Sequence, residues 1–185
     1  MKEPRVQIRD LTDDDERAFV TAAHASIELH HPWAYPPTEP ERFPSYLARF
    51  GDDKAYAFVV ELIETGALVG YVTISQVQRE PYERGTLGYG VFVPHQQHGY
   101  MTEALDLVIR HAFDHLRLHR LEAEIQPQNE PSVNLVKKLG FEHEGSSRGL
   151  ICIEGVWQDH ERWACVAPHP VGSNGEVKDV GARSR

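Results

Sequence analysis

The sequence has few of the features that mark disulfide-linked, metal-dependent or membrane proteins. Its 185 residues include only two cysteines, Cys152 and Cys165, and their spacing matches no zinc motif. The eleven histidines are scattered, and none falls in a metal-binding pattern with carboxylates. No apolar run approaches the roughly 20 residues that cross a bilayer, and no basic-then-apolar segment resembles a leader. We therefore expect a cytoplasmic protein with reduced thiols, no bound metal and no membrane partner.

Positive charge is also scarce. The chain carries 19 Lys and Arg residues against 28 Asp and Glu residues, a formal net charge of −9. Phosphate backbones reward clustered Lys and Arg, so this balance argues against a nucleic-acid partner. An acidic surface keeps a protein soluble, and it also favours the approach of an amine-bearing substrate.

Length and patterning indicate one domain with a C-terminal extension. A chain of 185 residues can bury about two thirds of the surface that it exposes when unfolded, so it needs no covalent staple. We expect the folded domain over residues 1–166. Residues 167–185 contain Pro, Gly, Ser and Asn without apolar periodicity and are expected to form a mobile tail.

The first half of the chain predicts a strand, two helices and a three-strand meander. Thr12, followed by four acidic residues, is a helix N-cap, and the helix is expected to run towards Leu29. Prolines interrupt residues 30–37, and Thr38 with Glu41 predicts a capping box for the second helix. Strands are expected over residues 6–11, 56–62, 68–76 and 86–93.

The turn at residues 96–102 is the most informative segment, because an apolar strand leads into it and an amphipathic helix leads out. A glycine turn at a helix start presents unpaired N–H groups and the positive end of the helix dipole, which favours a phosphate group. A tight connection that binds nothing remains the alternative. The helix is marked by apolar residues at spacings of three and four: Leu105, Val108, Ile109, Ala112, Phe113 and Leu116.

A second motif follows about thirty residues later. A strand at residues 121–125 leads into Asn129-x-x-Ser132, and a short helix over residues 132–139 ends at Gly140-Phe141. Together with Gln96-x-x-Gly99, this block resembles the two signatures of the GNAT superfamily of N-acetyltransferases, in particular the branch that acetylates ribosomal-protein N-termini. Met101 departs from the pattern, since the family has Gly or Ala there.

The resemblance implies an α/β (α+β) GNAT fold, with a mixed, mostly antiparallel central sheet, helices on both faces and a splayed strand pair. The splayed strands are expected at residues 88–93 and 121–125. Acetyl-CoA is implied as the co-substrate, with its pantetheine arm between these strands and on the backbone of Val91 and Val93. The implied cofactor-binding residues are Val91, Phe92, Val93, Gln96, Gln97, His98, Gly99, Tyr100, Met101, Thr102, Asn129 and Ser132.

The reaction implied by the resemblance is direct attack of a primary amine on the thioester in a ternary complex. Such a site must take a proton from the amine, hold the oxyanion and protonate the leaving thiolate. The tyrosine that many members use for the last step is replaced by Val136, and the resemblance assigns this role to Ser132. A merely structural serine is the alternative. The general base stays open among Glu28, His31 and Asp159, because no carboxylate lies on the strand at residues 86–93.

The acceptor amine is expected to enter between the loop at residues 30–37 and the turn at residues 154–159. The resemblance favours a protein or peptide N-terminal α-amine as acceptor. A small amine, such as an antibiotic, a polyamine or an amino acid, and a non-catalytic CoA-binding module are the alternatives, and a homodimer is also left open. The expected substrate-binding residues are His31, Trp33, Tyr35, Tyr89 and Trp157.

Overall fold

A single mixed sheet of seven strands organises the molecule, in the order β1-β2-β3-β4-β5-β7-β6. The structure, a computed structural model, describes residues 3–168, so the expected tail lies outside the described residues from residue 169 onward. The strands are β1 (Val6–Asp10), β2 (Tyr56–Leu62), β3 (Leu68–Gln78), β4 (Arg84–Val91), β5 (Arg120–Ile125), β6 (Glu142–Ile153) and β7 (Val156–Val166).

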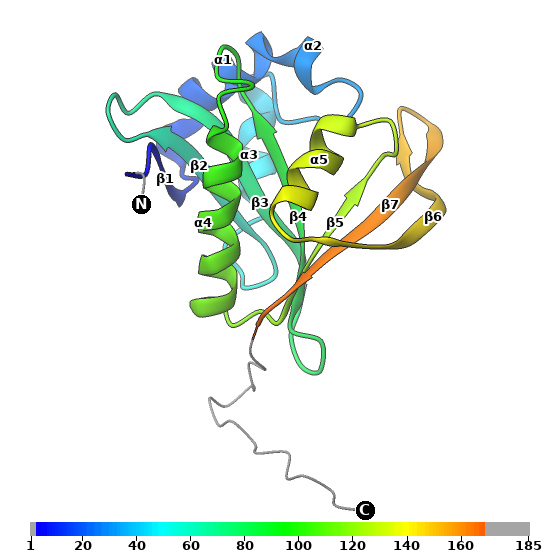
Figure 1. Ribbon diagram of the computed structural model, residues 1–185. Coiled ribbons are helices and arrows are strands. Elements are labelled where there is room, and N and C mark those ends of the chain that lie inside the picture. The colour runs from blue at the N-terminus through cyan, green and yellow to red at the C-terminus, as the bar shows by residue number, and fades with distance from the viewer. Residues whose placement is uncertain (1–2, 169–185) are drawn as a thin grey trace, which may run out of the picture.

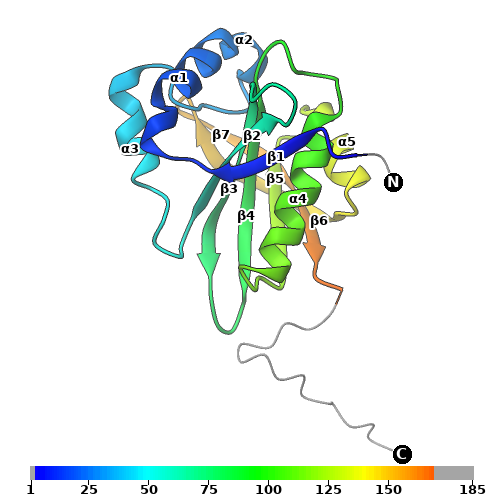
Figure 2. The same cartoon turned by 90° about the vertical axis from the view of Figure 1, so that its left-hand side faces the viewer.

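Helices cover both faces of this sheet. Figure 2 shows α1 to α3 on one side and α4 and α5 on the other. The helices are α1 (Glu16–Ala25), α2 (Ile27–His30), α3 (Phe43–Leu47), α4 (Tyr100–Asp114) and α5 (Glu130–Lys138), with short 3₁₀ turns η1 (Asp13–Asp15) and η2 (Pro40–Arg42). Each helical layer closes its own apolar core against the sheet.

Helix α4 confirms the apolar stripe expected from the sequence. Its side chains at Leu105, Val108, Ile109, Ala112 and Phe113 are buried against the sheet, whereas Leu116 is only partly buried. Burying one large aliphatic side chain contributes about 1.5–3 kcal/mol, so this stripe fixes the helix firmly. The packing of this stripe therefore also holds the start of α4 in place, directly after the turn of residues 96–102.

Thr12 is the N-cap that the sequence predicted, with a capping box to Asp15, but the expected helix towards Leu29 is not continuous. The segment begins as the 3₁₀ turn η1, and the α-helix breaks at Ser26 into α1 and α2. The Ser26 hydroxyl donates to the carbonyl of Ala22 at 2.7 Å and accepts the N–H of Val93 at 3.0 Å. This side chain therefore joins the helical layer to the chain just beyond β4 at the point of the break.

The expected capping box of Thr38 and Glu41 is also wrong. Glu39 is the N-cap of η2, because Pro40 takes the first position of the turn. The third strand of the meander ends at Val91 rather than Val93, where the chain turns through Pro94, which has no N–H to donate to a ladder.

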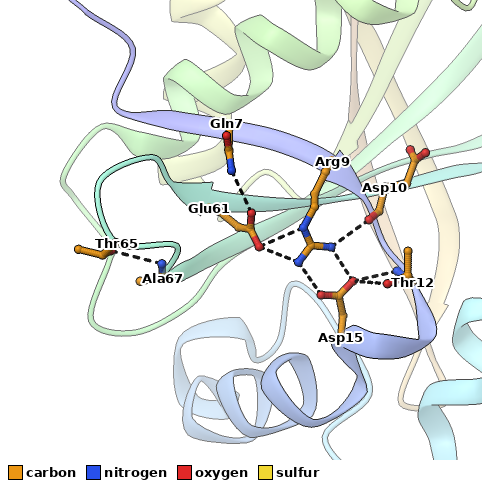
Figure 3. Close-up of polar contacts among 8 residues, drawn as sticks. All are labelled: Gln7, Arg9, Asp10, Thr12, Asp15, Glu61, Thr65 and Ala67. Carbon is orange, nitrogen blue, oxygen red and sulfur yellow. Dashed lines mark hydrogen bonds and ion pairs between the residues drawn. The ribbon is translucent and has the colours of Figure 1, made fainter.

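An ion-pair network fastens the start of the helical layer to the edge of the sheet (Figure 3). Arg9 on β1 donates to both carboxylate oxygens of Asp15, at 2.8 and 2.7 Å, and also to Glu61 on β2 at 2.6 Å. Burial acts to raise the pKa of Asp15, but hydrogen bonds from Arg9 and Thr12 outweigh it and keep this pKa below its usual value. The ionised carboxylate thus anchors the turn that leads into α1.

Strands β4 and β5 are parallel neighbours for only a short distance. Their register joins Arg84 to Arg120, Gly85 to Leu121 and Thr86 to Glu122, and no described pair continues it. Beyond this point the strands diverge, as Figure 1 shows. The splay predicted from the sequence is confirmed, and the unpaired stretch of β4 leads towards the turn before α4.

Candidate active site

A cavity of about 670 Å³ lies at the splay of β4 and β5. It is lined by the turn before α4, by the unpaired ends of the two strands, by the start of α5 and by the loop after α2. Residues from both faces of the sheet therefore meet in one space. The lining residues used below are Trp33, Arg49, Tyr89, Met101, Glu124 and Ser132.

The turn before α4 is built to receive an anion. Gly99 adopts a left-handed conformation, with φ of 80°, at the N-cap of a 15-residue helix. Within residues 3–168 the backbone N–H groups of Gly99, Tyr100 and Met101 donate to no acceptor. Three free amides at the positive end of a helix dipole form a site that suits a phosphate group.

Arg5, which the sequence analysis missed, fixes the shape of this turn. Its guanidinium donates to the carbonyl of His98 at 3.1 Å, pairs with Glu103 at 2.5 Å and lies 4.7 Å from the centre of the Tyr100 ring. The His98 ring in turn stacks on Tyr100. The chain before β1 thus braces the turn, and no local sequence signal indicates this because the partners are more than ninety residues apart.

The backbone at the end of β4 already has partners in the helical layer. Nε2 of His30 lies 2.8 Å from the carbonyl oxygen of Val91, and the N–H of Val93 is bonded to Ser26. A carbonyl oxygen has a second lone pair, so Val91 retains acceptor capacity. An amide-bearing ligand would have to displace Ser26 to reach Val93. Pantetheine binding at Val91 and Val93 remains a prediction.

Two glycines on β4, Gly88 and Gly90, leave the strand backbone uncovered by side chains where it lines the cavity. A Cβ on Gly90 would lie 2.6 Å from the ring of Tyr71, and one on Gly88 would lie 2.8 Å from the hydroxyl of Thr73. Neither position has room for a side chain, so the backbone is left open to the cavity that both glycines line.

Ser132 and Tyr89 face each other where α5 begins. Asn129 caps the helix by accepting the N–H of Ser132 at 3.3 Å. The Tyr89 hydroxyl lies 3.5 Å from the carbonyl oxygen of Ser132. Burial raises the pKa of Tyr89 to about 12, so its phenol stays protonated at neutral pH. Two hydroxyl donors therefore reach the cavity from this side.

Glu124, another residue that the sequence analysis missed, is the single carboxylate lining the cavity among the described residues. It lies on β5, two residues beyond Glu122, which pairs with Arg84 and Arg120 on the opposite face from α5. Because strand side chains alternate, Glu124 points to that same face. The cavity thus has a carboxylate on one face of the splay and the hydroxyls of Ser132 and Tyr89 on the other.

The three expected base candidates are not brought together. His31 lines a second cavity, where its Nε2 lies 3.4 Å from Glu154. Glu28 and Asp159 are exposed and line neither cavity. Asp159 instead accepts the N–H of Gly149 at 2.7 Å, which supports the irregular pairing of β6 and β7.

The second cavity, of about 340 Å³, lies beside the first and shares several residues with it. The contact between His31 and Glu154 brings the loop at residues 30–37 against the β6–β7 turn. Tyr35 lines both cavities, and Trp33 lines the larger one. Trp157 is 67% exposed on the outer hairpin and lines neither.

Most of the expected cofactor-binding residues line the larger cavity, with three exceptions. Phe92 is fully buried in the core beside Phe19, Val93 lies behind the cavity, and His98 stacks on the outside of the turn. Within residues 3–168 no group of three or more His, Cys, Asp or Glu side chains gathers into a metal site. No helix of that range is long and apolar enough to cross a membrane.

The family model described as an acetyltransferase (GNAT) domain matches residues 5–142, which includes both faces of this cavity. The chain belongs to the GNAT acetyltransferase family. The seven-stranded mixed sheet and its splay are the fold of that family, as the sequence motifs predicted. The site therefore belongs to an enzyme that transfers acetyl groups.

Relatives of this GNAT chain act on different amines. It is 36% identical over 128 residues to the probable N-acetyltransferase YjcK of Bacillus subtilis, a match covering 69% of this chain and 71% of YjcK. It is 35% identical over 101 residues to the ribosomal protein uS5-alanine N-acetyltransferase of Escherichia coli, covering 55% and 52% of the two chains. The Escherichia coli spermidine N(1)-acetyltransferase is 28% identical over 167 residues, covering 89% and 87%.

Among solved structures, RimJ of Mycobacterium smegmatis in complex with CoA-disulfide superposes with a TM-score of 0.81. Its sequence is 27% identical, and the match covers 88% of this chain and 82% of RimJ. A protein of the same fold thus binds a CoA derivative.

Proposed function

We propose that this GNAT enzyme transfers the acetyl group of acetyl-CoA to the N-terminal α-amine of a protein or peptide. The observation that carries the proposal is one cavity that joins the free amides before α4 to Glu124 and Ser132 across the splayed strands. The likeness to the uS5-alanine N-acetyltransferase favours an α-amine as acceptor.

The chemistry of the cavity supports acetyl-CoA as the co-substrate. The pyrophosphate of acetyl-CoA fits the amides of Gly99, Tyr100 and Met101, where helix dipole and hydrogen bonds act together. The pantetheine arm would then lie along the unpaired edge of β4, with the carbonyl of Val91 as an acceptor. This places the thioester between Glu124 and Ser132.

Glu124 is the residue that we assign as general base. An ammonium group must lose a proton before its nitrogen lone pair can attack the thioester carbon. The Glu124 carboxylate takes this proton, directly or through a water molecule, before the N–C bond forms. The tetrahedral intermediate then collapses and the C–S bond breaks. The hydroxyl of Ser132 or Tyr89 gives its proton to the leaving thiolate and regains one from the attacking nitrogen, which becomes the neutral amide.

The test is the release of CoA thiol with a panel of short peptides, small amines and no acceptor. Replacing Glu124 by Gln should lower kcat/KM for the acceptor about 100-fold, while the Kd of acetyl-CoA changes less than threefold, because only the acceptor loses its base. Glu122→Gln serves as the matched control on the same strand and face, and it should retain most of the activity.

Two outcomes would contradict this assignment. If no amine accelerates thiol release above the hydrolytic background, the chain is a CoA-binding module rather than an acetyltransferase of amines. If small amines are used at least a hundredfold better than any peptide, the acceptor is a small molecule. Intact-mass measurement of the peptides distinguishes N-terminal from side-chain acetylation.

A further inference from the structure

Arg49 stands out at the place where the two cavities meet. It follows the C-terminal end of α3 and lines both cavities, together with Tyr35 and Tyr46. Its guanidinium lies 5.6 Å from the ring centre of Tyr46 and 5.7 Å from that of Phe50. The two rings hold the cation in place without neutralising it.

No carboxylate within residues 3–168 forms an ion pair with Arg49, so its charge is available where the two cavities meet. The smaller cavity is also lined by the exposed Arg42. Its ion-pair partner, Glu39, lies 3.3 Å away and is exposed as well. No described Asp or Glu lines that cavity. Glu154, on the turn between β6 and β7, lies against His31 and next to Tyr35 at the edge of the cavities.

The charges of the joined cavities are therefore arranged in a definite order. Glu124, the single described carboxylate of the larger cavity, is half-buried on β5, and the guanidinium of Arg49 lines both this cavity and the smaller one. An acceptor that presents an ammonium group to Glu124 and a carboxylate to Arg49 would match both. A polyamine would match Glu124 but would place its second cation near two arginines.

We propose that Arg49, assisted by Arg42, forms a carboxylate-binding subsite, so the acceptor is a primary amine that also carries a carboxylate. This inference rests on the proposed function and specifies its acceptor. The carboxylate can come from an acidic side chain early in a peptide or from the α-carboxylate of a free amino acid. The planar guanidinium suits both sources, because it binds a carboxylate through two parallel hydrogen bonds.

The experiment compares acceptors that differ only in this charge. Ala-Asp-Ala amide is measured against Ala-Asn-Ala amide, and free alanine against alaninamide, with spermidine as a third class. In at least one of the two pairs, the wild type should have a kcat/KM about tenfold higher for the acceptor with the carboxylate than for its neutral counterpart. Arg49→Ala should remove this preference while the neutral acceptor changes less than twofold, and Arg49→Lys should restore part of it.

Two further variants sharpen the test. Arg49→Glu should improve spermidine relative to the acidic peptide, because the sign of the subsite is reversed. Arg110→Ala makes the same change in net charge as Arg49→Ala, but on an exposed face of α4, and should leave every preference unchanged. Which pair responds identifies the source of the carboxylate, peptide side chain or amino acid.

The two proposals can fail separately. Equal use of acids and amides by wild type and by Arg49→Ala overturns the subsite and leaves the acetyltransferase intact. If no amine is acetylated, calorimetry with acetyl-Ala-Asp-Ala amide and its Asn counterpart in the presence of CoA decides the subsite alone. Tighter binding of the acid that is lost in Arg49→Ala supports it, and equal binding overturns it.

Discussion

At the residue scale, the site divides proton removal and proton donation between the two faces of the splay. Glu124 faces the helical layer of α1 to α3, whereas Ser132 and Tyr89 lie where α5 begins. A buried phenol with a pKa of about 12 and a serine hydroxyl are both protonated at neutral pH, so either can serve the leaving thiolate. Substituting each residue in turn shows which hydroxyl protonates the thiolate.

Ser132→Ala is expected to lower kcat ten- to a hundredfold and to leave the Kd of acetyl-CoA near its normal value, because proton donation acts only in the transition state. Steady-state thiol release and calorimetry measure the two quantities. Ser146→Ala, on an exposed position of β6, is the control. A loss of less than twofold in Ser132→Ala, together with a large loss in Tyr89→Phe, would transfer the role to Tyr89.

At the scale of the element, the turn before α4 depends on a backbone conformation rather than on a side chain. A Cβ on Gly99 would lie 3.5 Å from the Arg5 guanidinium, an ordinary contact, so space alone does not require glycine there. The φ of 80° at Gly99 is what requires glycine, because a β-branched residue is strained in the left-handed region. The three free amides depend on this conformation.

Gly99→Val should therefore raise the Kd of acetyl-CoA at least tenfold, as measured by calorimetry. Gly66→Val is the matched control, because Gly66 has a φ of 69° and open space around it in the β2–β3 turn, and it lines neither cavity. The control should lose stability without losing affinity. An unchanged Kd in Gly99→Val would contradict phosphate binding at this turn.

At the scale of the whole molecule, the stability should depend on pH through imidazoles that the fold shields from water. A carbonyl oxygen can only accept, so Nε2 of His30 donates to Val91, and its buried Nδ1 has no partner within residues 3–168. Burial lowers the pKa of His30, and burial with the neighbouring His115 lowers that of His111. The folded protein therefore holds both imidazoles in the neutral form at pH values where the unfolded chain takes up protons.

Acidification should destabilise the fold below about pH 6.5, where unfolded histidines begin to bind protons, while the contribution is fully retained above that pH. The Tm should thus fall between pH 7.5 and 5.5. His30→Gln and His111→Gln should each flatten this dependence, and His24→Gln, on an exposed position of α1, should leave it unchanged. A wild-type Tm that is constant over this range would contradict the prediction.

The sequence alone determined the features whose cause is local. The apolar spacing from Leu105 to Phe113 specifies α4, because side chains three and four positions apart share one helix face. The apolar residues between Tyr56 and Leu62 specify β2, although the four consecutive residues 57–60 are buried rather than alternate ones. The glycine turn with Asn129-x-x-Ser132 specifies the family and its splayed strands. Helix breaks were less predictable, since the break at Ser26 depends on a contact with Val93.

The tertiary structure decided which side chains of the site act together. Glu122 and Glu124 look alike in the sequence, but Glu122 is bound by Arg84 and Arg120 where the strands still pair, and Glu124 faces the cavity where they have parted. Arg49 looks like any other arginine in the sequence, but the fold places it between two cavities, with no carboxylate of the described residues paired to it. Burial and charge pairing depend on contacts between residues that are far apart in the chain, and a local sequence pattern does not reveal such contacts.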